Sequence, residues 1–207
     1  GSKRIKNKNL QKVGKKTLVA HTIEFAKKIL PTKNIILSTD SPKIRKIGED
    51  YNLKIYNLRP KKFATSNTTS YKSAEYEIKE YEKRNSSINT IVLLQPTSPF
   101  RSVKTYKKII KKFFKKPSQP LITIKRVPLE CNKFYKIKRS KLIRLTNKSD
   151  REFVYLPNGS FFIISKKILL KEKSFTSRNM QYQIIEDFKE NIDIDTWQDL
   201  KLAKKLI

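Results

Sequence analysis

Cysteine and histidine are almost absent from this 207-residue chain, which contains only Cys131 and His21. A single cysteine allows no disulfide within the chain and no cysteine metal cluster. A single histidine excludes a multi-histidine metal site and makes a histidine-based catalytic triad a poor hypothesis. His21 lies in a helical pattern, so we expect it to have a packing or surface role. A reducing, cytoplasmic setting fits this composition.

Long apolar runs are also missing. No run approaches the length that spans a bilayer, and the N-terminal GSKRIKNKN lacks the apolar core of a signal peptide. We therefore expect a soluble protein with no membrane partner.

Acidic residues are scarce, with 18 against 48 basic ones, and the formal net charge is +30. Such an excess suggests a polyanionic partner, and a basic nucleic-acid-binding protein is one hypothesis. However, the lysines are scattered over nearly every segment, as coding bias toward Lys, Asn and Ile would also produce. They are not interleaved with aromatic residues in a recognised binding motif. Nucleic acid is therefore the less favoured partner.

Hydrophobic periodicity predicts an α/β fold in one domain that spans residues 1–207. After a basic loop over residues 1–16, helices and short strands alternate, and this order favours a mostly parallel central sheet with helices on both faces. The predicted helices cover residues 17–30, 43–51, 71–83 and 103–115, and the predicted strands cover 34–39, 53–58, 88–94 and 121–127. Ser41 is the expected N-cap of the second helix, with Pro42 at its first position.

The pattern changes at Pro128. Two short runs on either side of Arg139 and Ser140 predict a hairpin outside the main alternation, and we interpret residues 128–156 as a dimerisation excursion. We then expect a strand over 153–164 interrupted by the PNG turn, a short helix over 165–170 and a strand near 183–186. Residues 192–195 resemble the end of a strand. A last helix follows, with Asp195 or Thr196 as N-cap and Gln198 or Asp199 completing a capping box.

The segment VLLQPTSPFR, residues 92–101, is the first candidate for function, because an apolar strand stops there at a proline-bracketed polar turn. Ligands of open α/β sheets bind outside the carboxyl ends of the strands. Gln95, Thr97 and Ser98 would then face a ligand. Read alone, the segment is equally well explained as a good turn.

Two further segments carry charged groups that suit a nucleotide. Asp193 and Asp195 alternate along an extended segment, so both carboxylates project to one side and would suit Mg²⁺. The alternative is that Asp195 only caps a helix. The N-terminal lysines and Arg4 in GSKRIKNKN suit a phosphate group, and a solvated basic tail is the alternative.

Taken in order, four segments resemble the acylneuraminate cytidylyltransferase family. They are GSKRIKNKNL, STDS with RPKKFATSNTTS, LLQPTSPFR, and PNGSFFI with IDIDT. The resemblance spans nearly the whole chain, and LLQPTSPFR and IDIDT are its most specific parts. It implies a Rossmann-like nucleotidyltransferase fold, a homodimer, and a reaction in which CTP and a nonulosonic acid give a CMP-sugar and pyrophosphate for glycan synthesis. Pseudaminic or legionaminic acid is the alternative acceptor.

The resemblance also implies roles for particular residues. Lys8 would stabilise charge on the α-phosphate, and Asp193 and Asp195 would be the Mg²⁺ ligands. The implied CTP-binding residues are Ser2, Lys3, Asn9, Arg59 and Ser70, and the implied sugar-acid-binding residues are Gln95, Thr97, Ser98 and Asn158.

The chain departs from the family pattern in three places. Family members have an apolar strand and an arginine-containing turn before the GS that opens this chain, so we expect the first strand to be missing through truncation. The arginine expected from a dimer partner for the substrate carboxylate has only Arg151 as a candidate. Ser66 stands where an aspartate is common.

Overall fold

The computed structural model describes residues 4–65, 67–128, 135–138, 141–144 and 153–207. Its centre is a four-stranded sheet in the order β3-β7-β4-β8, formed by Thr90–Leu93, Phe153–Ser165, Leu121–Pro128 and Gln181–Ile184. Strands β3, β4 and β8 share one direction, and β7 runs antiparallel between β3 and β4. The α/β class is confirmed. The sheet is mixed and not mostly parallel as predicted, because β7 pairs antiparallel with both β3 and β4 and only β4 and β8 pair in parallel.

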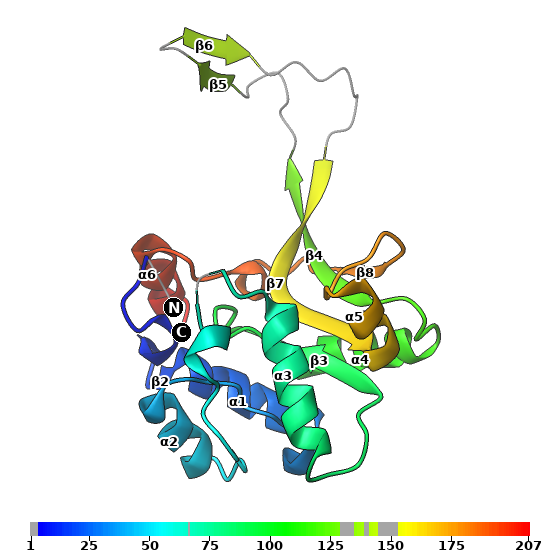
Figure 1. Cartoon of the computed structure of the whole chain (residues 1–207). Coiled ribbons are helices and arrows are strands. Elements are labelled where there is room, and N and C mark those ends of the chain that lie inside the picture. The colour runs from blue at the N-terminus through cyan, green and yellow to red at the C-terminus, as the bar shows by residue number, and fades with distance from the viewer. Residues whose placement is uncertain (1–3, 66, 129–134, 139–140, 145–152) are drawn as a thin grey trace.

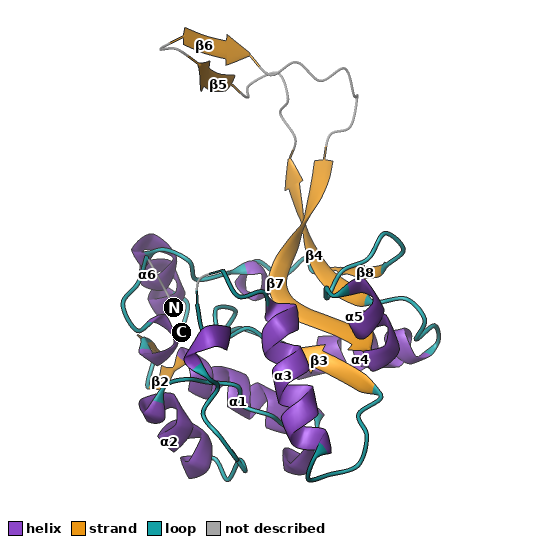
Figure 2. Ribbon diagram, viewed as in Figure 1, coloured by secondary structure: helices purple, strands orange, loops and turns teal. Residues whose placement is uncertain are grey.

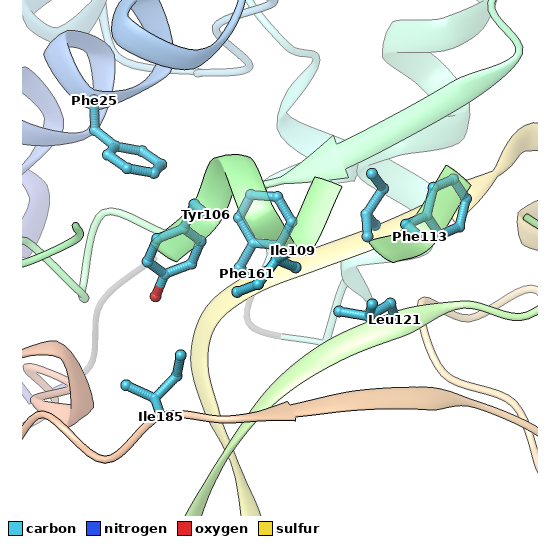
Figure 3. Packing of buried hydrophobic residues seen from close by; sticks show 8 residues of the cluster. Phe25, Tyr106, Ile109, Phe113, Leu121, Phe161 and Ile185 are labelled. Atoms are coloured by element: carbon cyan, nitrogen blue, oxygen red, sulfur yellow. The ribbon is translucent and has the colours of Figure 1, made fainter. Parts of the chain in front are cut away.

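Helices cover both faces of this sheet, as predicted (Figure 1). Along β7, side chains alternate between the faces. Phe161 and Ile163 pack with helices α1 (Leu18–Ile29) and α4 (Val103–Phe114), and Figure 3 shows the aromatic core of this cluster. Phe162 and Ile164 pack on the other side with α3 (Ser70–Glu82) and α5 (Lys166–Glu172).

Several helices begin at a side-chain cap, and two of these caps, Ser41 and Thr196, agree with the prediction. The Thr17 side chain accepts a hydrogen bond from the Ala20 amide at the start of α1, and Ser41 caps α2 (Pro42–Asp50). Thr196 and Asp199 form the predicted capping box of α6 (Trp197–Lys205). His21 lies on α1 with its Nε2 2.8 Å from the Val13 carbonyl oxygen, which agrees with a packing role.

Two predicted strands, over residues 34–39 and 53–58, are wrong. The backbone is extended at Ile35, but neither segment forms a ladder with any strand in the part of the chain that the structure describes. The 3₁₀ turn η2 covers Thr32–Asn34 at the start of the first segment, and a second turn, η3, covers Lys61–Phe63 after the second segment. Leu37 and Ile55 still pack against Val19 and Ile23 of α1, so their apolar character reflects burial against a helix.

The N-terminal segment predicted as a loop contains short regular elements. A 3₁₀ turn, η1, covers Lys8–Leu10, and β1 (Lys12–Val13) pairs antiparallel with β2 (Lys16–Thr17). Ile5 and Val13 are fully buried against Ile194 and Leu200 near the other end of the chain. The two ends of the chain therefore lie side by side (Figure 1).

The predicted hairpin is present as β5 (Tyr135–Lys138) and β6 (Lys141–Arg144). Along the chain, the hairpin lies between β4 and β7. The outer parts of these two strands form a two-stranded ribbon that extends beyond the body of the molecule (Figure 2). The PNG turn lies within β7 and shifts its register with β4, because Ile122 lies opposite Phe162 whereas Ile124 lies opposite Pro157. β8 begins two residues before the predicted strand, and the turn η5 covers Lys189–Asn191. The dimerisation role of residues 128–156 stays a prediction.

None of the helices within the described ranges has the length and apolar character needed to cross a membrane.

Candidate functional site

The site is built on an ion pair that joins the two ends of the chain. The Lys8 ammonium lies 2.7 Å from Oδ1 of Asp195, although 187 residues separate them. Asn7, in the left-handed conformation with φ 52°, turns the chain into η1 and so sets the direction from which Lys8 approaches. The Lys8 side chain is only 14% exposed, whereas Asp195 is 54% exposed. The basic N-terminal segment and the two-carboxylate segment therefore meet.

Alternation along residues 192–195 directs the two carboxylates away from the core. Ile192 and Ile194 are buried among apolar side chains, so Asp193 and Asp195 project to the other side. The Ile194 amide donates to the Thr97 carbonyl at 2.8 Å, which sets this segment beside the QPTSP turn. The predicted strand end is wrong, because the segment is assigned to no ladder within the described ranges.

Asp193 combines burial with an unused oxygen. Its Oδ1 is buried and has no hydrogen-bond partner among the described residues. Burial raises the pKa of Asp193, a hydrogen bond with the Thr97 side chain opposes that rise, and the charge of Asp195 adds to it. A buried carboxylate oxygen without a partner is costly unless a cation or donor satisfies it.

These two carboxylates fit a Mg²⁺ site. Mg²⁺ is usually held by one or two carboxylates together with substrate phosphates, rather than by a complete protein cage. The described part of the chain contains no cluster of three or more His, Cys, Asp or Glu side chains suited to a metal. The donors present are those of an open, two-carboxylate site.

Gly159 brings the QPTSP turn and Asp193 together. It has φ 74°, and a Cβ atom at this position would lie 3.2 Å from both Oδ2 of Asp193 and Oε1 of Gln95. Any other residue would be strained by its backbone and would press on both side chains. The side chains of Gln95 and Asp193 thus meet at the PNG turn.

The structure turns two of the predicted sugar-acid residues inward. Asn158 is 1% exposed, and its Oδ1 accepts from the Thr123 hydroxyl at 2.6 Å while its amide donates to Asn191 at 3.0 Å. Ser98 is fully buried, and its Oγ has no partner within the described residues. This geometry does not agree with direct ligand contact by Asn158. The Asn158 side chain instead ties the PNG turn to Thr123 and Asn191. Sequence reasoning missed Thr123 and Asn191, since no motif marks them.

Arg59 is held by the STDS segment. It donates to the Ser38 hydroxyl at 3.2 Å and lies 3.9 Å from Asp40, while its Nε is buried without a partner among the described residues. Ser38 in turn donates to Glu77 of α3 at 2.6 Å, and burial raises the pKa of this carboxyl. The STDS motif signalled Ser38, but nothing local signalled Glu77.

A cavity of about 260 Å³ joins the predicted nucleotide and sugar-acid residues, because Ser70 and Gln95 both line it together with Phe162 and Phe175. A second cavity, of about 250 Å³, lies between α3 and residues 35–37 and 54–57, and none of the predicted site residues line it. Asn9 is partly buried in η1. Ser2, Lys3, Ser66 and Arg151 lie outside the described residues.

Proteins of known name match this chain along nearly its whole length. The chain is 28% identical over 214 residues to a CMP-N,N'-diacetyllegionaminic acid synthase of Legionella pneumophila, covering 100% of this chain and 92% of that protein. It is 31% identical over 221 residues to an N-acylneuraminate cytidylyltransferase of Escherichia coli, but spans only 49% of that protein's length.

The fold resembles a solved CMP:2-keto-3-deoxy-manno-octonic acid synthetase complexed with CTP, with a TM-score of 0.70, 11% identity, and coverage of 100% and 93% of the two chains. The family model described as cytidylyltransferase matches residues 1–206. The chain therefore belongs to the cytidylyltransferase family of nucleotidyltransferases.

Proposed function

We propose that this protein transfers the cytidylyl group of CTP to a nonulosonic acid and releases pyrophosphate. The observation that carries the proposal is the convergence of Lys8, Asp193, Asp195 and Gln95 from three distant segments. Relatives named for diacetyllegionaminic, N-acylneuraminic and pseudaminic acid support the acceptor class without selecting one member of it.

The chemistry depends on charge and position. A triphosphate repels nucleophiles through its own negative charge, so catalysis relies on neutralisation and in-line placement. Mg²⁺ held by Asp193 and Asp195 would supply part of that neutralisation. The anomeric hydroxyl of the acid gives up its proton to solvent, its oxygen forms a new bond to the α-phosphorus of CTP, and the bond from that phosphorus to pyrophosphate breaks.

Lys8 supplies a cation in the same place. Its ammonium is paired with Asp195 in this structure, and we assign it to the charge that builds on the α-phosphate during attack. Gln95 and Thr97 are assigned to the acid, and Arg59, Asn9 and Ser70 to the nucleotide, together with Ser2 and Lys3.

We further propose a cytoplasmic homodimer formed through the β4–β7 ribbon. Tyr155 and Leu156 on this ribbon are each 47% exposed, which leaves apolar surface that a second copy would cover. Sedimentation equilibrium tests this proposal, and a monomer at micromolar concentration contradicts it.

The direct test is pyrophosphate release from CTP with a panel of N-acetylneuraminic, legionaminic and pseudaminic acids, with Mg²⁺ and with EDTA. We expect activity with at least one acid, and its loss in EDTA, in Asp193→Asn and in Asp195→Asn. Asp50→Asn is the matched control, since Asp50 pairs with Lys46 on the distant helix α2. Wild-type protein that turns over none of these acids refutes the function, and full activity in both site variants refutes the metal site.

A further inference from the structure

Arg101, the last residue of the QPTSPFR motif, has no role in the proposed reaction, yet it links three segments of the site. Its Nη2 donates to the Gln95 carbonyl at 2.6 Å, and its Nε donates to the Ser160 carbonyl at 3.0 Å. Nη1 lies 3.4 Å from the Thr22 hydroxyl on α1. One guanidinium therefore joins the QPTSP turn, strand β7 and helix α1.

The surroundings of Arg101 hold the guanidinium in one place. It lies 5.5 Å from the centre of the Phe25 ring, and Phe25 packs edge-on against Tyr106, whose hydroxyl is hydrogen-bonded to Ser160. Burial lowers the pKa of Arg101 to about 10, and electrostatic interactions with Tyr106, Asp193 and Glu190 oppose that shift. Arg101 remains a cation at neutral pH.

The two carbonyls that Arg101 binds flank the centre of the site. Gln95 carries the amide that lies against Gly159, and Ser160 directly follows Gly159. The Gln95 carbonyl also accepts from the Ser98 amide at 3.3 Å, so it closes the QPTSP turn and anchors it to Arg101. Only a planar group with several fixed donors reaches both carbonyls from one side chain, and the ammonium of a lysine does not reproduce that fork.

We propose that Arg101 is a positioning residue for the acceptor acid. It fixes the QPTSP turn to β7 so that the Gln95 side chain is already oriented toward the acid before binding. Arg101 itself touches neither substrate. This inference rests on the proposed function, because it names what sets the acid subsite of that same centre.

The kinetic test uses Arg101→Lys, which keeps the charge and loses the fork. Losing a charge-assisted hydrogen bond that holds a binding group predicts a KM for the acid raised about tenfold with a lower kcat. The KM for CTP stays within about twofold of wild type, because Arg101 makes none of its hydrogen bonds to Arg59 or Ser70. A merely structural role predicts lower thermal stability with unchanged KM values in the folded fraction. Unchanged KM values for both substrates, or an equal rise of the KM for the acid and the KM for CTP, overturn the proposal.

A second measurement does not depend on turnover. Amide hydrogen exchange over residues 95–101 is expected to be faster in Arg101→Lys, with exchange over α3 unchanged. Arg84→Lys is the matched control, since Arg84 also donates to a carbonyl, that of Glu80 in α3, and also lies over an aromatic ring, that of Tyr56. If wild type is inactive with every acid, the proposed function fails, and exchange still decides whether Arg101 holds the turn. Unchanged exchange over residues 95–101 overturns the proposal.

Discussion

At the scale of single residues, the sequence predicts which groups carry chemistry better than it predicts their orientation. Lysines and a close carboxylate pair suggest a nucleotide and a cation, and the Lys8–Asp195 ion pair brings them together. The inward orientation of Asn158 depends on Thr123 and Asn191, which lie 35 and 33 residues away in the chain. No local pattern contains that information. The same is true of Ser98, which the packing around the QPTSP turn buries completely.

Replacing Lys8 with Ala should reduce kcat far more than it weakens CTP binding. Removing one group that stabilises charge in the transition state costs about 100-fold in kcat. Lys12→Ala is the control, because Lys12 is an exposed lysine on the neighbouring strand β1. Steady-state kinetics with varied CTP at saturating acid measures kcat and the KM for CTP. Equal turnover in Lys8→Ala and wild type excludes the assigned role.

At the scale of elements, local signals predict helices and non-local pairing decides strands. Thr17, Ser41 and Thr196 determine helix starts through their own side chains, so the sequence is nearly sufficient to locate where these helices begin. Residues 34–39 and 53–58 have the apolar, β-branched character of strands, yet a strand also needs a neighbour. The direction of β7 also cannot be predicted from its own residues, because a parallel and an antiparallel strand can have the same apolar pattern.

The capping box of α6 predicts a pH-dependent loss of stability. Burial alone would raise the pKa of Asp199, but hydrogen bonds from the Thr196 side chain and from the Thr196 and Asp195 amides lower it below its ordinary 3.8. A carboxyl with a lowered pKa stabilises the folded protein above its unfolded pKa and loses that contribution as pH falls through the folded pKa.

Urea unfolding at several pH values checks this prediction. At pH 7, Thr196→Ala should lose about 1 kcal/mol of unfolding free energy, which is typical of a lost N-cap. Asp199→Asn should also be less stable than wild type at pH 7, and the gap should narrow as pH falls below 3.8. A gap that stays constant down to pH 3 contradicts the role of the carboxylate. Glu49→Gln on α2 is the control, since its ion pair with Arg45 is exposed.

At the scale of the whole molecule, the fold brings residues that are far apart in the sequence close together in space. Ile5 and Val13 pack with Ile194 and Leu200, and this cluster carries the charged residues of both ends to one place. The composition predicts the field of the molecule, since a net charge of +30 attracts an anionic nucleotide whatever the fold. The remaining question is whether that attraction acts through the site alone or through the entire surface.

Salt dependence separates these two possibilities. The Debye length is about 30 Å at 0.01 M salt and about 8 Å at 0.15 M, so remote charges act on CTP only at low ionic strength. We expect kcat/KM for CTP to fall as salt rises at fixed free Mg²⁺, with kcat nearly constant. Salt-independent kcat/KM contradicts steering by the molecular field.

A triple variant of helix α4 locates the source of that effect. Lys107, Lys108 and Lys111 are exposed on this helix, away from the candidate site, and none of the ion pairs in the described part of the chain involves them. Changing all three to Gln removes three positive charges without touching the site. If the whole surface steers CTP, the variant has a lower kcat/KM than wild type at 0.01 M salt and the same value at 0.15 M. If only the lysines of the site act, the two proteins agree at both salt concentrations, and the wide distribution of lysine reflects composition without a role in substrate capture.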